Sequence, residues 1–293
     1  MEVAASAFKT MDAINAMNAN TPWQAQPPHS DYAAPVRHAA RSSRERPKAT
    51  ENKRSIMSTP PRQNRLLRAL PDADWQRWQP LLEWVDMPLG QVLCESGREH
   101  SHVYFPTNAI VSLHYLLENG STAEFAVVGA EGVVGISLFM GGGSTPSRAV
   151  VQSAGQGWRL RASVIQEEFE RSKTVLQLLL RYTQALITQM AQKAVCNRHH
   201  SLDQQLCGFL LVSLDRLQGD DLLLTQELIA NMLGVRREGV TEAALKLQRK
   251  GVLRYARGRI TVLNRHALEQ GSCECYAVVK QEYKRLLPEA LFA

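Results

Sequence analysis

The chain has 293 residues, a length that suits one or two domains and allows a sizeable hydrophobic core. Its net charge is +6 with a pI near 9.2, a balance that suits a polyanionic partner. No run approaches about 18 consecutive apolar residues, and no apolar signal core opens the chain, so neither a membrane protein nor a secreted one is expected. The five cysteines lack framework spacing, which indicates a reducing compartment. We therefore expect a cytoplasmic protein without a membrane partner.

Residues 1–62 predict a disordered N-terminal extension, because Asn, Ala, Ser, Pro and Arg dominate and neither regular period is present. The run from Arg41 to Arg54 holds six basic and two acidic residues. It is either a solvated tail or a basic arm that adds nonspecific DNA affinity. Met57 is an alternative start of the chain.

Residues 63–162 predict a β-rich domain. A short helical segment is expected over residues 63–84. From about 85 to 160, short apolar stretches separated by turn signals recur roughly every ten residues, which is typical of an antiparallel β-roll or jelly roll. The dipeptide Asn119-Gly120 is a strong hairpin signal. Seven acidic residues and one basic residue lie between Glu83 and Glu131, so this domain gains nothing from contact with DNA.

Residues 163–200 predict a connecting helix, whose long part runs from Lys173 to about Asn197. Its apolar positions alternate in steps of four and three, which is the 3.5-residue period of a coiled coil. This period predicts a dimerisation helix; the alternative is a helix packed only on its own domain. The predicted seam consists of Leu176, Leu180, Thr183, Ile187 and Met190, and continues to Ala194.

The stretch from Leu224 to Leu263 predicts two helices joined by a tight turn. Thr225 can cap the first helix, and Gly234 tolerates the positive φ of a sharp turn. The second helix is apolar on one face at Val240, Ala243, Ala244 and Leu247, and polar on the other at Arg236, Arg237, Glu238, Thr241 and Glu242. A second helix that is polar and basic at its start is typical of a helix-turn-helix that enters the DNA major groove.

The sequence after the two helices predicts a β-hairpin, which we interpret as the wing of a winged helix-turn-helix. Its strands are expected at residues 253–255 and 259–263, with a turn at Arg257-Gly258. Between Arg236 and Arg265 there are nine Lys or Arg residues against two acidic ones, a surplus larger than that of the whole chain. Charge placed this way would meet phosphates, so residues 201–293 predict a winged DNA-binding domain. The plainer alternative is an all-α domain with a solvated basic face.

An acidic β-roll, a long helix and a basic winged helix-turn-helix, in this order, resemble the Crp/Fnr family of bacterial transcription regulators. The resemblance covers about residues 66–263 and is most specific at LTQELIANMLGVRREGVTEAALKLQRKGVL. It implies an α+β fold with an N-terminal double-stranded β-helix (jelly-roll) sensor domain, a dimerisation helix and a C-terminal winged head. It further implies a homodimer on two-fold-symmetric double-stranded DNA, with RNA polymerase as a partner and no enzymatic activity.

Carried over from this resemblance, Arg237 and Glu238 would read bases. Arginine can donate two bonds to guanine, and glutamate accepts from the cytosine amino group. Glu242 stands where many family members have a second arginine, so the usual half-site is in doubt. The DNA-contacting set implied is Thr225, Gln226, Arg236, Arg237, Glu238, Thr241, Glu242, Arg257 and Arg259.

The family's cyclic-nucleotide pocket uses a Gly-Glu pair for the ribose and an Arg followed by Ser/Thr-Ala for the phosphate. Here the first position is Gly135-Ile136, without a carboxylate, and the second is Arg148-Ala149, without the hydroxyl. Gly135, Arg148 and Ala149 are the candidate effector residues, but a cyclic nucleotide is not expected. No cysteine precedes Cys94, so the N-terminal iron–sulfur cluster of the oxygen-sensing branch is not expected either, and the cofactor stays unknown.

Two cysteine groupings remain. Cys273-Glu274-Cys275 is a weak candidate for a soft metal or a labile disulfide, with His266 as the only nearby third ligand. The group formed by Cys196, His199 and His200 reads as a polar hinge. Neither grouping supplies four ligands, so we assign no metal site. The alternative to a DNA-binding regulator is a metal- or redox-responsive module whose winged head binds a protein. An enzyme is not expected, because no P-loop, nucleophile elbow or HExxH motif is present.

Overall fold

The computed structural model describes residues 63–118, 122–217, 221–256 and 258–287. The predictions for the extension 1–62, the start at Met57, the Asn119-Gly120 turn and the side chain of Arg257 lie outside these residues. Within the described residues, no helix combines the length and apolar character needed to cross a bilayer.

Two short helices lead into the β-roll: α2 (Arg65–Arg68) and α3 (Asp72–Trp78), followed by the 3₁₀ turn η2 (Gln79–Leu81). Asn64 caps α2, and its buried amide donates to the carbonyls of Pro106 and Gly132, at 2.9 Å each. The prediction of helix as far as residue 84 is wrong at its end, because a strand begins at Glu83. Cross-strand contacts decide this: Glu83 lies opposite Arg159, and Trp84 packs edge-on against Trp158.

The roll consists of two antiparallel sheets, as the turn spacing predicts. One sheet has the strand order β1-β7-β3 and the other β2-β6-β4-β5. The strands are β1 (Glu83–Met87), β2 (Val92–Cys94), β3 (His102–Pro106), β4 (Ile110–Leu116), β5 (Thr122–Val128), β6 (Arg148–Ser153) and β7 (Gly155–Arg161). Val103, Phe105, Val111, Val128 and Leu160 are buried in its core. These apolar residues come from both sheets, and the helices that surround the roll contribute to the same core.

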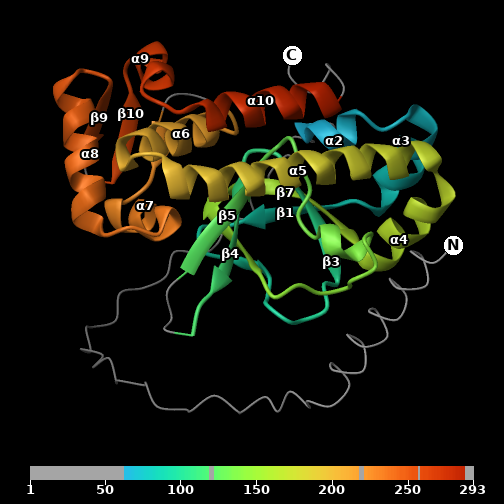
Figure 1. The fold of residues 1–293 in the computed structure, drawn as a ribbon. Coiled ribbons are helices and arrows are strands. Elements are labelled where there is room, and N and C mark those ends of the chain that lie inside the picture. The colour runs from blue at the N-terminus through green and yellow to red at the C-terminus, as the bar shows by residue number, and fades with distance from the viewer. Residues whose placement is uncertain (1–62, 119–121, 218–220, 257, 288–293) are drawn as a thin grey trace, which may run out of the picture. The chain divides into compact units, whose positions relative to one another are not determined.

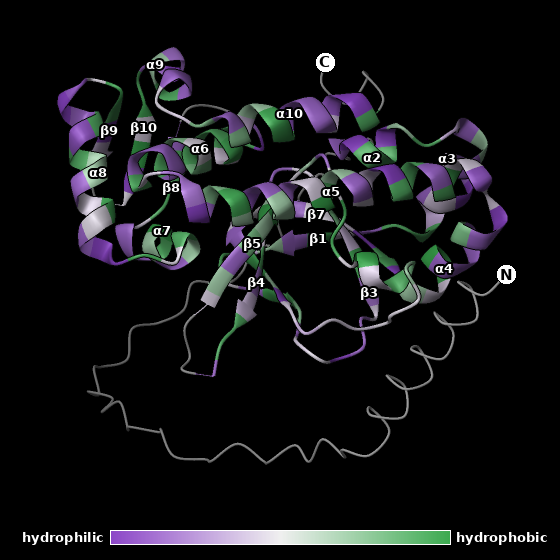
Figure 2. Cartoon of the chain, in the orientation of Figure 1, coloured by the Kyte–Doolittle hydropathy of each residue, from purple (hydrophilic) through white to green (hydrophobic). Residues whose placement is uncertain are grey.

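Three helices follow the roll: α4 (Ala162–Arg171), α5 (Lys173–His199) and α6 (Leu202–Leu214). Ser172 caps α5 by accepting the Val175 N–H, and Ser201 forms a capping box with Gln204 at the start of α6. The long helix is therefore confirmed and extends two residues beyond its predicted end. It carries both green and purple bands along its length, as expected for a helix with one buried and one exposed face (Figure 2).

The winged head is built from α7 (Gln226–Leu233), α8 (Arg237–Arg249), β9 (Leu253–Ala256) and β10 (Arg259–Val262). These elements confirm the predicted helix-turn-helix and hairpin. A third strand, β8 (Asp221–Leu223), pairs with β10 and was not expected, because three residues are too few to show a period. The head has its own core, to which Leu210, Ile229, Val240, Leu247 and Ile260 contribute.

After the wing, the chain forms α9 (Arg265–Gln270) and α10 (Glu274–Leu286), which the sequence analysis did not identify separately. Helix α10 lies along α5 (Figure 1). Its residues Val279, Tyr283 and Leu286, with Leu287 after it, join the hydrophobic core of the roll rather than that of the head. The last described helix therefore connects the head back to the β-roll.

A buried polar network connects these parts. Arg216, just after α6, forms an ion pair with Glu131 of the roll, with 2.8 Å between Nε and Oε1 and both side chains 7% exposed. Arg216 also donates to Gln189 Oε1 on α5 (3.2 Å), which accepts from the hydroxyl of Tyr283 on α10 (2.9 Å). The amide of Gln189 donates to the carbonyl of Val127 on β5 (3.2 Å). We call Glu131, Gln189, Arg216 and Tyr283 the interdomain hub.

Replacing one partner of the buried ion pair should be strongly destabilising. In Arg216→Met the Glu131 carboxylate stays buried without its cation, so the free energy of unfolding should fall by about 3–5 kcal/mol. The double variant Arg216→Met/Glu131→Gln should recover part of this loss, as measured by urea denaturation. As a control, Arg285→Ala, which removes an exposed ion pair to Glu282 on α10, should leave the midpoint unchanged. If Arg216→Met and Arg285→Ala lowered the free energy of unfolding equally, burial would not be the reason why the Arg216–Glu131 pair matters for stability.

Candidate nucleic-acid interface and ligand sites

The helix-turn-helix is fixed by local interactions at both ends of α7. The Thr225 hydroxyl accepts the Leu228 N–H at 3.1 Å, so the predicted cap is present. Gly234 ends the helix in the left-handed region, with φ of 67°, where a side chain would be strained. Helix α8 then buries its predicted apolar face, consisting of Val240, Ala243, Ala244 and Leu247.

The opposite face of α8 begins with exposed charged side chains. Arg236, Arg237, Glu238 and Glu242 are exposed, and Arg236 makes no side-chain cap. The half-buried hydroxyl of Thr241 donates to Gln226 Oε1 at 2.7 Å, which joins the first turn of α7 to the second turn of α8. Glu242 forms an exposed ion pair with Lys246 at 3.4 Å.

A hydrogen bond to α7 holds the wing next to the exposed face of α8. The hydroxyl of Tyr255 on β9 accepts the backbone N–H of Gln226 at 3.1 Å. Arg254 and Arg259 are exposed, and Arg259 lies 3.5 Å from Asp221 of β8. The structure thus brings the described members of the DNA-contacting set together around the starts of α7 and α8 and the wing. The sequence analysis did not predict that Tyr255 joins the wing to the start of α7, although an aromatic side chain within a basic hairpin stands out in the sequence.

The candidate effector residues do not form a cyclic-nucleotide site. Arg148, on β6, is already paired with Glu95, with 2.8 Å between Nε and Oε1 and 3.1 Å between the terminal nitrogen and Oε2. Its guanidinium fork is thus engaged by a carboxylate of the same chain. Gly135 has a φ of 100° before the 3₁₀ turn η3 (Ile136–Leu138), and Ala149 is buried in the strand core. The residues present do not fit the ligand.

The predicted coiled-coil seam divides between two faces of α5. Leu180 and Ile187 are 47% and 53% exposed. Thr183 is buried with its hydroxyl bonded to the Leu179 carbonyl, and Met190 packs against the core of the roll. Leu176 is half-buried. Thr183 and Met190 therefore serve the chain's own core, and only the remaining seam positions are available to a second copy.

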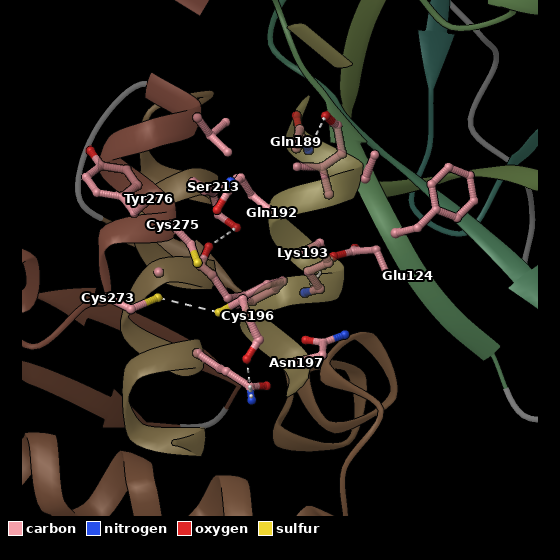
Figure 3. A pocket seen from close by; sticks show the side chains of 18 residues that line it. Glu124, Gln189, Gln192, Lys193, Cys196, Asn197, Ser213, Cys273, Cys275 and Tyr276 are labelled. Atoms are coloured by element: carbon pink, nitrogen blue, oxygen red, sulfur yellow. Dashed lines mark hydrogen bonds and ion pairs between the residues drawn. The ribbon is translucent and has the colours of Figure 1, made fainter. Parts of the chain in front are cut away.

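A pocket lies between β5, α5, α6 and α10 (Figure 3). Glu124 and Lys193 line one side, with 3.8 Å between the Lys193 nitrogen and Glu124 Oε1. The Ser112 hydroxyl donates to Glu124 Oε2 at 2.9 Å. Burial nevertheless raises the pKa of the Glu124 carboxyl, against the opposing effect of Lys193. Nothing in the sequence except its place in an acidic segment indicates that Glu124 is buried.

Three cysteines also line the pocket, and the imidazole of His200 lies beside them. The ligand atoms of Cys196, His200, Cys273 and Cys275 all lie within 4.8 Å of one another, and we call these residues the thiol–imidazole cluster. Burial raises the pKa of Cys196 to about 12 and that of Cys275 to about 11. The two groupings that sequence analysis treated separately thus come together. His266 is not part of the cluster, because it is exposed and bonded to Gln270.

Comparisons with known proteins agree with this architecture. Residues 84–172 match the model of the cyclic nucleotide-binding domain, and residues 204–270 match that of the Crp-like helix-turn-helix domain. A putative transcriptional regulator of the crp/fnr family from Eubacterium rectale is similar in structure, with a TM-score of 0.57 and 18% identity over 71% of this chain and 97% of that one. FixK2 from Bradyrhizobium japonicum has a TM-score of 0.56 and 17% identity over 66% and 98% of the two chains. A comparison with curated protein sequences gives no significant match.

The raised pKa of Glu124 predicts a pH-dependent effect of Glu124→Gln. The folded state favours the protonated carboxyl, so the wild type loses stability relative to the variant as pH rises from about 4.5 through the raised value. We expect the variant to match the wild type near pH 4 and to unfold at a higher denaturant concentration at pH 7, where the buried carboxylate of the wild type must be ionised or hold its proton at a cost. A difference that stays constant between these pH values would contradict this assignment.

Proposed function

Because the chain belongs to the Crp/Fnr family of transcription regulators, we propose that it is a homodimer that binds a two-fold-symmetric DNA site through its winged heads. Members of this family are regulators rather than enzymes. In this proposal a signal received by the roll or by α5 changes the placement of the heads. Contact with RNA polymerase and a cytoplasmic location belong to the same proposal, since the chromosome and the polymerase are found there.

The observation that carries the proposal is the division of α8 into two faces. Val240, Ala243 and Ala244 hold the helix in the head, and this leaves Arg237 and Glu238 exposed in its first turn. A helix that presents its N-terminal turns in this way fits the B-DNA major groove. Arginine is suited to guanine O6 and N7, and glutamate to the cytosine amino group. Arg236, Arg254 and Arg259 flank this turn and suit the phosphates.

The exposed side of α5 supports the dimer. Leu180 and Ile187 are seven residues apart, and Ala194, which is also exposed, follows after another seven. Apolar residues at this spacing form one stripe on a slightly supercoiled helix. A second copy of α5 packed on this stripe would bury it and place two heads side by side, as a palindromic site requires.

The interdomain hub supports the coupling between sensor and head. Glu131 and Gln189 belong to the roll and α5, whereas Arg216 belongs to the segment that leads into the head. A ligand that favours one arrangement of these groups would shift the population of head placements by its difference in affinity for the two states. The match to two half-sites about one helical turn apart would change with it.

Replacing Arg237 should relax DNA specificity at one position of each half-site. The wild type is first used to select its site from random DNA; Arg237→Ala should then lose about 1–3 kcal/mol of discrimination at a single base pair. Arg98→Ala, an exposed arginine of the roll, should bind like the wild type. Unchanged specificity in Arg237→Ala would contradict the base-reading role. A wild-type affinity that does not change with salt concentration would favour a head that binds protein, because the affinity of a protein for DNA falls steeply as the salt concentration rises.

Replacing Ile187 should separate the dimer. In Ile187→Asp a charge would be buried between the two copies of α5, so sedimentation should show a monomer at concentrations where the wild type is dimeric. Affinity for the two-fold site should fall with it, because one head contacts one half-site. Leu89→Asp, at an apolar side chain that is 63% exposed on the roll, is the matched control. A dimer in both variants would place the interface elsewhere.

A further inference from the structure

The thiol–imidazole cluster combines residues from two distant helix ends. Cys196 lies in the last turn of α5 and His200 caps that helix four residues later. Cys273 caps the start of α10, and Cys275 lies in its first turn. Residues i and i+4 share a helix face, so the first pair points the same way. The packing of α10 along α5 then brings the second pair to it.

The distances within the cluster are those of a tetrahedral metal site. The sulfur atoms of Cys196 and Cys273 are 3.5 Å apart, and Cys275 Sγ is 3.5 Å from His200 Nδ1. Bond lengths of about 2.3 Å to sulfur and 2.0–2.1 Å to nitrogen place tetrahedral ligands about 3.8 Å and 3.6 Å apart. The widest separation in the set, within 4.8 Å, needs only a shift of about 1 Å to reach this spacing.

The neighbours of the cluster hold the ligands in place. His200 turns its other ring nitrogen, Nε2, toward Glu274 Oε1 at 3.3 Å. A carboxylate on the far nitrogen is the usual partner of a metal-bound histidine, because it fixes the tautomer that leaves Nδ1 free to bind. The amide of Gln205 donates to the carbonyls of His200 (2.9 Å) and Cys196 (3.4 Å), and so fixes the end of α5.

We propose that Cys196, His200, Cys273 and Cys275 bind one zinc ion per chain. Three thiolates and an imidazole are a ligand set that selects Zn²⁺ over harder cations. All four positions are supplied by the protein, which is typical of a structural site rather than a catalytic one. Binding releases the thiol protons to solvent, and the pocket that the three cysteines line gives the ion access.

The competing chemistry is a disulfide between Cys196 and Cys273. Such a bond would use two of the four groups and would leave unexplained why His200 Nδ1 points at Cys275 while Nε2 is held by Glu274. Zinc accounts for all four side chains and for the carboxylate behind the histidine. The site also has a mechanical consequence: it clamps the end of α5 to the start of α10, at the point where the chain enters the head.

The first experiment counts metal in the full-length protein, purified under reducing conditions without chelator. Inductively coupled plasma mass spectrometry should find about one zinc per chain in the wild type. Cys196→Ser, Cys275→Ser and His200→Ala should each fall below about 0.2 equivalents. Cys94→Ser, at a buried thiol of the roll, and His199→Ala, at the exposed neighbour of His200, should keep the metal. His200→Cys should also keep it, because a fourth thiolate completes the same site.

The second experiment does not depend on variants that fold. Wild-type protein stripped with a chelator under reductant is titrated with Co²⁺, which should give the visible absorption bands of a tetrahedral thiolate site with an end point near one equivalent. Zn²⁺ should displace Co²⁺ and raise the melting temperature by roughly 5–10 °C. A stripped protein that binds neither ion would overturn the proposal. So would zinc retained in all the ligand variants, or a Cys196–Cys273 disulfide found by non-reducing peptide mapping in a second preparation made without reductant.

Metal binding can be measured without DNA, so this test stands apart from the proposed function. A regulatory role of the site rests on that function and has its own readout: the DNA affinity of the zinc-loaded and stripped forms. A zinc site with no effect on DNA affinity would leave the metal assignment intact and limit it to stability. Failure of all DNA binding would overturn the proposed function alone.

Discussion

The ion pair between Arg216 and Glu131 is the interaction on which the arrangement of this chain depends. Two charges removed from water are stable only where hydrogen bonds complete their surroundings. Gln189 provides one of these bonds, and it connects the pair to the backbone of β5 and to Tyr283. The roll, the long helix, the entrance to the head and the last described helix thus meet at one set of polar contacts. Because such contacts are directional, they specify an orientation that apolar packing alone would leave loose.

The β-roll differs from what its match to the cyclic nucleotide-binding domain suggests. Glu95 occupies the guanidinium of Arg148, so the position that suits a cyclic phosphate is neutralised within the chain. Both the pocket with Glu124 and the thiol–imidazole cluster lie instead on the final turns of α5. Ligand chemistry in the described residues is therefore concentrated where the long helix meets the head.

Local signals predicted most of the fold. Thr225, Gly234 and the 3.6-residue period of α8 act over a few residues, so the helix-turn-helix could be identified before its structure was known. The predicted seam on α5 is wrong at Thr183, which is buried in the chain's own core, and its exposed positions stay a prediction. A heptad count finds apolar positions without saying which of them the chain's own core takes. The thiol–imidazole cluster could not be predicted, since 77 residues separate Cys196 from Cys273 and nothing local shows that α10 returns to α5. The sequence contains no local sign that the chain returns from the head to α5, and this return is what brings the four residues together.

That return has a consequence for motion. The chain enters the winged head through α6 and leaves it through α10, and α10 is embedded in the core of the roll. Helix α7 of the head also contacts β5 of the roll, and Arg216 is paired with Glu131. With these contacts, the two chain connections restrict how far the head can turn relative to the roll. Detachment of α10 would remove one of the connections and leave the orientation of α8 less strictly determined.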